Sequence, residues 1–174
     1  MSQLPSALAP SLADSVDADM LLSLDPLERA RQHALRELAM SEEAYGAALA
    51  EVLQAYSYAN CSAWLAKDMH DAVVGDLAPL LDLSRHLGQR LALRRSSDGT
   101  YDRIADIMIV HFPSIELVYA RYCEKSAAAK HKIEALAASN ANFAAFLAQG
   151  KQACGNMDIH SYRLRPLQRL TKCV

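Results

Sequence analysis

Apolar residues recur at intervals of three and four along most of this chain, which is the spacing of helices that bury one face. The first such stretch predicts a helix from Asp25 to about Tyr58. Asp25 can serve as its N-cap, and Glu28 can return a hydrogen bond to the cap as the second half of a capping box. The expected apolar stripe of this helix is Leu27, Ala34, Leu38, Tyr45, Leu49, Val52 and Tyr56.

The chain ahead of this helix has a different character. Residues 1–24 are rich in Ser, Ala, Pro and Asp and show no hydrophobic period. Such a segment buries too little apolar surface to offset the entropy of ordering it. We therefore expect a flexible leader over 1–24 and a domain over 25–174.

Three more elements are expected in the middle of the chain. A short helix is predicted around Trp64, and a longer one begins near Asp76 and ends before the RRSSDGTY stretch, where Asp98–Gly99 is a turn signal. A further helical stretch runs from about Tyr101, and Pro113 is expected to kink or restart it.

The last third of the chain continues the helical period. Ser139–Asn140 is expected to break or cap the stretch, and Gly150 is expected to end the next helix. A loop should span 154–159, and Pro166 is expected to be the first residue of a closing helix. No segment alternates as a half-buried strand does, so the predicted fold is all-α: an elongated, antiparallel helical bundle without a sheet.

Composition narrows the class of protein. The 174 residues carry a net charge of −2, which gives no global basic field for nucleic acid. No apolar run approaches the roughly 20 residues of a membrane span, and the N-terminus lacks the pattern of a signal peptide. The four cysteines form no CxxC pair and the six histidines no HExxH spacing, which favours reduced thiols, no metal or other cofactor, and a cytoplasmic location.

The closing segment RPLQRLTKCV carries two different faces. The residues at spacings of three and four on its apolar side are Leu167, Leu170 and Val174. Those that gather beside them are Gln168, Thr171 and Lys172. An apolar back with an amide, a hydroxyl and a cation in front suits contact with another protein and is too sparse for covalent catalysis, so no catalytic residue is expected.

Glu42 is the unusual residue of the first helix, because it lies on or beside the apolar stripe. A carboxylate in that position must be paired, or must lie at a rim that a partner can reach. From this helix alone, a structural bond to a neighbouring helix and a partner-binding role both remain open.

Four segments in order support a comparison with a known family: RELAMSEEAYGAAL, VVGDLAPLLDLSRHLGQRL, HFPSIELVYARYCEKSAAA and SYRLRPLQRLTK. Together they resemble the conserved regions of the Dbl-homology (DH) domain of Rho guanine-nucleotide exchange factors. The matching residues are Arg31, Glu37, Leu38, Ser41, Glu42, Tyr45, Gly75, Asp76, Leu77, Leu81, Leu87, Phe112, Pro113, Tyr119, Tyr122, Cys123, Arg165, Pro166, Gln168, Arg169 and Lys172. Cys173 departs from the family pattern, which has tyrosine there.

The resemblance implies a fold, a function and a site. It implies a DH bundle that promotes GDP release from a Rho, Rac or Cdc42-type GTPase, with Glu42, Gln168, Thr171 and Lys172 as GTPase-binding residues and no enzyme chemistry. The family's domain continues past this motif, so the resemblance also implies a truncated domain whose final helix is missing. The loss of that helix predicts self-association through the uncovered apolar strip. The alternative is a helical interaction module derived from a DH domain that has lost exchange activity.

Overall fold

A computed structural model describes the backbone of residues 23–172 and the side chains of residues 23–171. Its helices are α2 (Pro26–Ala55), α3 (Lys67–Val74), α4 (Ala78–Ala92), α5 (Ala105–Ser139), α6 (Ala141–Ala153) and α7 (Ile159–Lys172), with 3₁₀ turns η2 (Tyr58–Asn60) and η3 (Gly75–Leu77). No strand occurs in this part of the chain, although one isolated antiparallel bridge joins Arg95 to Tyr101. The predicted all-α class is confirmed.

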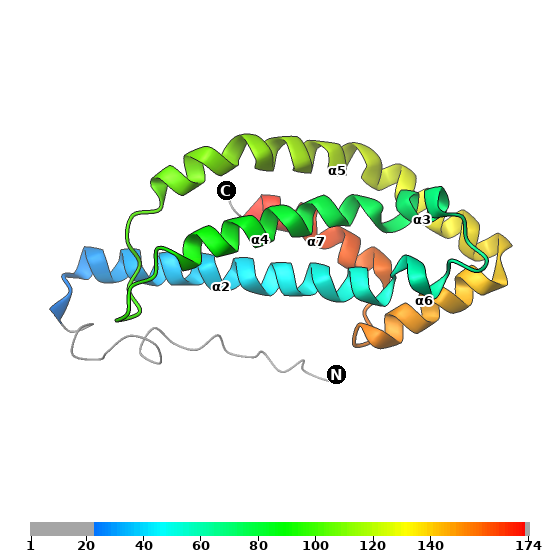
Figure 1. Ribbon diagram of the computed structural model, residues 1–174, viewed down its shortest axis with the longest axis horizontal. Coiled ribbons are helices and arrows are strands. Elements are labelled where there is room, and N and C mark those ends of the chain that lie inside the picture. The colour runs from blue at the N-terminus through cyan, green and yellow to red at the C-terminus, as the bar shows by residue number, and fades with distance from the viewer. Residues whose placement is uncertain (1–22, 173–174) are drawn as a thin grey trace.

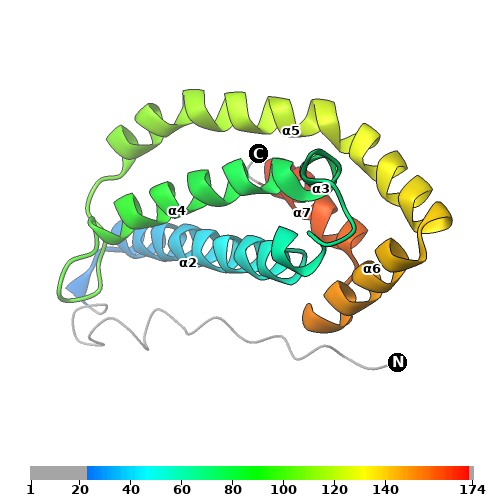
Figure 2. The ribbon, with the colours of Figure 1, turned by 45° about the vertical axis from the view of Figure 1, so that its right-hand side comes forward.

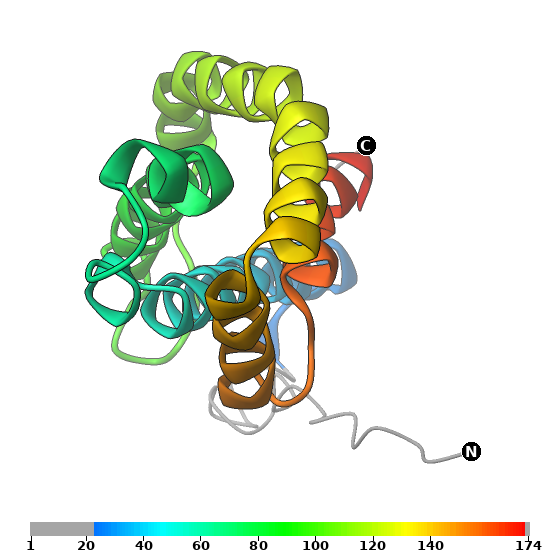
Figure 3. The ribbon, with the colours of Figure 1, turned by 90° about the vertical axis from the view of Figure 1, so that its right-hand side faces the viewer.

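The helices form an elongated antiparallel bundle. α2 and α4 run side by side in opposite directions, and α5 arches along the length of the molecule above α4 (Figure 1). α6 turns back from the end of α5 (Figure 2). Viewed down the long axis, α7 lies on the opposite side from α4, where it contacts both α2 and α5 (Figure 3). The last described turn of the chain therefore lies beside the middle of the first long helix.

The start of α2 is fixed by its cap. The Asp25 carboxylate accepts from the backbone N–H groups of Leu27 at 2.8 Å and Glu28 at 3.0 Å, which confirms the predicted N-cap. The expected capping box is wrong in its second half. The Glu28 carboxylate accepts instead from Arg31 and Gln32, because these side chains lie one turn further along the same face.

The first half of α2 buries polar side chains, which corrects the predicted stripe. Leu27 is 84% exposed and Ala34 is also exposed, whereas Gln32 and Arg36 are buried. Gln32 donates to the Tyr101 carbonyl and accepts from the Tyr101 N–H, both at 2.7 Å. The buried amide thus pairs with the loop between α4 and α5 where an apolar residue was expected.

Two predicted boundaries in the middle of the chain are wrong. Trp64 lies in the turns ahead of α3, and its ring packs edge-on against Phe143 and Phe146. Tyr101 lies in the bridge and α5 begins only at Ala105. Both residues pack against the bundle from irregular backbone, Tyr101 buried and Trp64 partly buried, so their spacing imitates a helical period. Pro113 lies inside α5. The helix therefore continues through the proline, as a kinked helix can, and does not restart there.

The two later helix ends also differ from expectation. Asn140 caps α6 through the Phe143 N–H as predicted, but α6 continues past Gly150 to Ala153. A Cβ on Gly150 would lie 2.2 Å from Cε1 of Tyr56, so this glycine makes room for a ring and does not end the helix.

Pro166 is buried inside α7 and is not its first residue. The helix begins seven residues earlier at Ile159, where the Asp158 carboxylate accepts from the Ser161 N–H at 2.8 Å. The closing helix is therefore two turns longer on its N-terminal side than the proline suggested, because tertiary packing overrides that local signal.

One large core runs through the bundle. The largest side chains that are less than 2% exposed are Leu49, Val52, Tyr56, Val73, Val74, Leu77, Leu80, Leu91, Ile107, Tyr122, Ile133 and Phe143. Leu91 and Ile107 form a second, smaller cluster with Leu87 between α4 and α5. The others belong to the large core, which Ile159 and Tyr162 join from α7. Among the described residues, no helix is long and apolar enough to cross a membrane.

Candidate functional site

Glu42 lies in the middle of α2 and faces α7. Its side chain is only 6% exposed and is paired with an arginine of α7, so the structural bond to a neighbouring helix that was left open is present. Arg169 of α7 donates to this carboxylate through Nη2 and to the Ser41 carbonyl through Nη1 at 3.3 Å. The same guanidinium lies over the ring of Tyr45, 4.9 Å from its centroid. The ion pair and the ring contact hold the carboxylate at the seam between the first and last helices.

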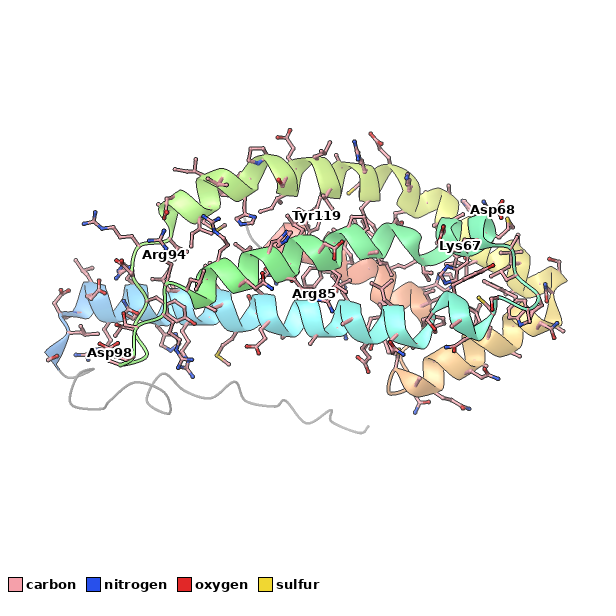
Figure 4. All side chains as sticks on the ribbon, in the orientation of Figure 1. Lys67, Asp68, Arg85, Arg94, Asp98 and Tyr119 are labelled. Atoms are coloured by element: carbon pink, nitrogen blue, oxygen red, sulfur yellow. The ribbon has the colours of Figure 1, made fainter. Side chains whose placement is uncertain are left out.

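Two tyrosines extend this cluster to α5. The Tyr119 hydroxyl donates to the Tyr45 hydroxyl at 3.2 Å. Figure 4 shows Tyr119 projecting from α5 into the bundle. Burial raises the pKa of Tyr45 far above its usual value, and the neighbouring Tyr119 hydroxyl raises it further, so the Tyr45 phenol stays protonated. On the other side, the Ser84 hydroxyl of α4 donates to the Glu42 carbonyl at 3.3 Å. Glu42 is thus bonded from α4 and α7, and α5 joins the cluster through Tyr45.

A small hollow opens beside the cluster. Its volume is about 120 Å³, and its polar walls are Glu42, Tyr45, Ser84, Tyr119 and Arg169. The remaining lining is apolar: Leu38, Leu80, Leu83, Leu87, Met108, Phe112, Ile115 and Leu170. Two of these side chains are themselves exposed, Phe112 by 56% and Leu170 by 37%. The surface around the buried charge pair is therefore apolar and accessible, which is the composition of a protein-binding patch.

The other three predicted site residues also lie on α7. Gln168 directly precedes Arg169, and Thr171 and Lys172 follow it. Gln168 and Thr171 are exposed, and the Thr171 hydroxyl donates to the Gln168 carbonyl at 2.9 Å. Gln168 is one residue before Arg169, so it points about 100° away around the helix and does not join the Glu42 pair. Lys172 is the last described helical residue, and its side chain lies outside the described part, as does Val174.

A buried salt bridge fixes the position of α7. The guanidinium of Arg163 binds both carboxylate oxygens of Asp76, at 2.7 and 2.6 Å, and donates to the Val73 carbonyl at 2.8 Å. The Tyr122 hydroxyl donates to the Arg163 carbonyl. Such a bidentate pair is directional, so it sets the rotation of α7 and thereby the face that meets α2.

Sequence reasoning missed the role of Arg169. It noted the residue as part of a matching motif but assigned the interface to its neighbours. The signal that could have found it is the burial requirement of Glu42, because a carboxylate on an apolar stripe needs a cation from another element. Two arginines of α7 supply such a cation. Half-buried Arg169 pairs with Glu42, and buried Arg163 pairs with Asp76.

The exposed apolar side chains of α7 bear on the predicted self-association. Leu164 is 52% exposed, whereas Leu167 packs against the core. Only part of the predicted apolar strip is uncovered in the described residues, and self-association stays a prediction. Cys61, Cys123 and Cys154 are free thiols, of which Cys123 is exposed and the other two are buried. No group of three potential metal ligands occurs among the residues that the structure describes.

The sequence and the bundle match a known class of domain. The family model of the RhoGEF domain matches residues 34–174, so the chain belongs to the RhoGEF (DH) domain family. Human Rho guanine nucleotide exchange factor 16 is 25% identical over 164 residues, an alignment that covers 92% of this chain and 23% of that protein.

Solved structures agree on the fold. The DH/PH fragment of PDZ-RhoGEF, solved in complex with human RhoA, superposes with a TM-score of 0.82 at 19% identity and covers 94% of this chain. The DH/PH domains of p115-RhoGEF superpose with a TM-score of 0.78 at 21% identity. The chain spans 48% and 47% of these two structures and about a quarter of the curated relative. The elongated bundle is therefore of the DH type.

Proposed function

We propose that this domain binds a Rho-family small GTPase and promotes release of its GDP. The observation that carries the proposal is the Glu42 carboxylate, which Arg169 holds at the α2–α7 seam beside an accessible apolar hollow. Membership of the RhoGEF family supports it, as do the solved complexes of similar domains with RhoA.

The physical role of such a surface is differential binding. An exchange factor forms no covalent bond with its partner. It binds the nucleotide-free GTPase more tightly than the GDP-bound one, and by linkage it weakens GDP binding by the same factor. A carboxylate that is already oriented loses little entropy when it meets the partner, so more of its interaction energy favours the nucleotide-free complex.

Each predicted residue has a part in this proposal. Glu42 engages switch I of the GTPase, and the accessible Phe112 and Leu170 surround that contact with apolar surface. Gln168 and Thr171 bind the partner from the exposed side of α7, and Lys172 supplies a cation near the switches. Arg169 orients Glu42 and does not itself need to touch the partner.

A second candidate is a helical interaction module without exchange activity. The observation that favours it is that Arg169 already satisfies Glu42, so a structural role alone accounts for the buried carboxylate. Both candidates use the same bundle and differ in whether binding discriminates between nucleotide states.

Two readouts on one set of GTPases separate the candidates. The chain is mixed with Rho, Rac and Cdc42-type proteins loaded with a fluorescent GDP analogue, and release is followed with excess unlabelled nucleotide. Capture of nucleotide-free and GDP-loaded GTPase by the immobilised chain is measured in parallel. Acceleration with at least one GTPase, together with preferential capture of its nucleotide-free form, supports exchange. Equal capture of both forms without acceleration supports the module.

A further inference from the structure

A second and larger cavity lies at the end of the bundle that carries α3. It has a volume of about 780 Å³ and opens between α3, η3 and the start of α4 on one side and the middle of α5 on the other. Figure 2 shows this end of the bundle, where α3 lies close to α5. The volume falls within the range of roughly 300–1,000 Å³ that is usual for small-molecule sites.

Small residues face one another across this cavity. Ala72, Gly75 and Ala78 come from the α3–α4 side, and Ala128 and Ala129 come from α5. Short side chains at facing positions leave a hollow that longer ones would fill. Small residues on both the α3–α4 side and the α5 side therefore leave this cavity open.

Cations line the α5 wall without neutralising partners. Arg121, Lys125 and Lys132 all contribute to the cavity, and among the residues that the structure describes none of them forms an ion pair or a hydrogen bond. Positions 121, 125 and 132 fall within about 40° of one another around a helix. They are spaced by ~6 and ~10 Å along its axis. The three charges therefore form one row along the mouth of the cavity.

The carboxylates of the cavity are already engaged elsewhere. Asp76 is held by the buried Arg163, and Asp71 pairs with Lys67 at the start of α3, where Figure 4 labels the lysine. The hydrogen bond from Lys67 holds the pKa of Asp71 below its usual value, so this pair stays intact at neutral pH. Neither carboxylate is available to neutralise the α5 row, which leaves a positive rim around a hollow of small residues.

We propose that this cavity binds a small polyphosphate: a ring or short chain that carries at least two phosphate groups, either free in solution or as a lipid headgroup. Three unpaired cations in a row can each contact a different phosphate of one ligand, and the arginine can do so through two parallel hydrogen bonds. The small walls accommodate the body of the ligand. The cavity contains none of Glu42, Gln168, Thr171 or Arg169, so this proposal is independent of the proposed exchange activity.

Binding by the full chain is measured with inositol hexakisphosphate by calorimetry and with phosphatidylcholine vesicles containing phosphatidylinositol 4,5-bisphosphate by co-sedimentation. The test variant is Lys125→Gln/Lys132→Gln. The control is Lys130→Gln/Lys151→Gln, which removes the same charge outside the cavity; Lys130 lies on α5 within 4.0 Å of Glu134. All four lysines are exposed, so both variants are expected to fold, which circular dichroism checks.

The test variant should bind the soluble probe or the phosphoinositide vesicles at least about 10-fold more weakly than the control. Loss confined to the soluble probe identifies a free phosphate compound as the ligand, and loss confined to the vesicles identifies a lipid headgroup. The proposal is overturned if neither probe binds, if both variants lose affinity equally, or if phosphatidylserine vesicles or an oligoglutamate peptide bind as tightly as the phosphate probes.

Discussion

At the scale of single residues, the Glu42–Arg169 pair has two consequences that can be measured separately. As a structural pair it joins α2 to α7, and as an oriented carboxylate it serves the proposed interface. Removing one partner leaves the other charge poorly solvated, because only 17% of the Arg169 side chain and 6% of the Glu42 side chain are exposed.

A double-mutant cycle measures the structural part. Glu42→Gln and Arg169→Gln should each lower the free energy of unfolding, and the double variant should lose less than the sum, with a coupling of about 0.5–3 kcal/mol. Urea denaturation of the four proteins gives this value. Additive losses would show that the pair contributes nothing to the fold, and would leave Glu42 free to serve the interface alone.

A pair of glycines offers a sharper test of packing. Gly150→Ala should destabilise the fold by about 1–3 kcal/mol, because its Cβ would lie 2.2 Å from the Tyr56 ring. Gly88→Ala in α4 is the matched control. Nothing lies within 4 Å of its Cβ, so this change should stabilise the helix by about 0.5–1 kcal/mol. Opposite signs in thermal or urea unfolding are expected; a neutral Gly150→Ala would contradict the tight contact.

At the scale of elements, one buried amide of α2 binds the loop between α4 and α5, beside the Arg31 side chain, which also donates to the Tyr101 carbonyl at 3.2 Å. Gln32→Ala removes both hydrogen bonds to Tyr101 and should cost about 1–3 kcal/mol. Exchange of the Tyr101 amide proton should become faster, since its acceptor is gone. Gln54→Ala, an exposed glutamine on the same helix, is the control and should leave both quantities unchanged. Unchanged exchange at Tyr101 in Gln32→Ala would show that the loop is held by other contacts.

The helices show which features the sequence predicts and which it does not. The period of the apolar residues predicts α2, α4 and α5, and the caps at Asp25 and Asn140 follow from local chemistry. Gln32 could not be recognised, because a polar residue is buried only if a partner from a distant loop reaches it. Pro166 and Gly150 were misread for a related reason: their local signals are real, but packing against other helices decides whether the helix continues.

At the scale of the whole molecule, the tyrosines of the core link stability to alkaline pH. Burial raises the pKa of Tyr56 and of Tyr122 to about 12, above the ordinary value of 10. The folded protein therefore keeps protons that the unfolded chain loses. This contribution to stability is complete below pH 10 and is lost as the pH rises through about 12.

Melting temperatures between pH 8 and pH 11.5 test this linkage. They should be flat at first and then fall above about pH 10. Tyr122→Phe should make the fall less steep, since one such group is removed, although the variant also loses the hydrogen bond to the Arg163 carbonyl. A melting temperature that stays constant up to pH 11.5 would contradict the burial of these hydroxyls.

The architecture of the site could be anticipated only in part. The resemblance of four ordered motifs predicts the DH bundle, and the family match and the fold confirm it. Glu42 was singled out because a carboxylate on an apolar stripe is costly, and that argument left open whether a neighbouring helix or a partner satisfies it; the structure supplies a cation from α7. Which residue supplies it depends on the rotation of α7 relative to α2. The buried Arg163–Asp76 bridge sets that rotation, and no local pattern encodes such a pairing between distant segments.

The central claim is that Glu42 acts on the GTPase in addition to joining two helices. The most direct measurement is the rate of fluorescent GDP release from a Rho-family GTPase with the unchanged chain, with Glu42→Gln and with Glu43→Gln, the adjacent exposed glutamate. The account predicts that Glu43→Gln accelerates release as the unchanged chain does, whereas Glu42→Gln loses at least about 10-fold of the acceleration while remaining folded at the assay temperature. Equal acceleration by all three proteins, or none by the unchanged chain with any Rho, Rac or Cdc42-type GTPase at high protein concentration, would contradict it.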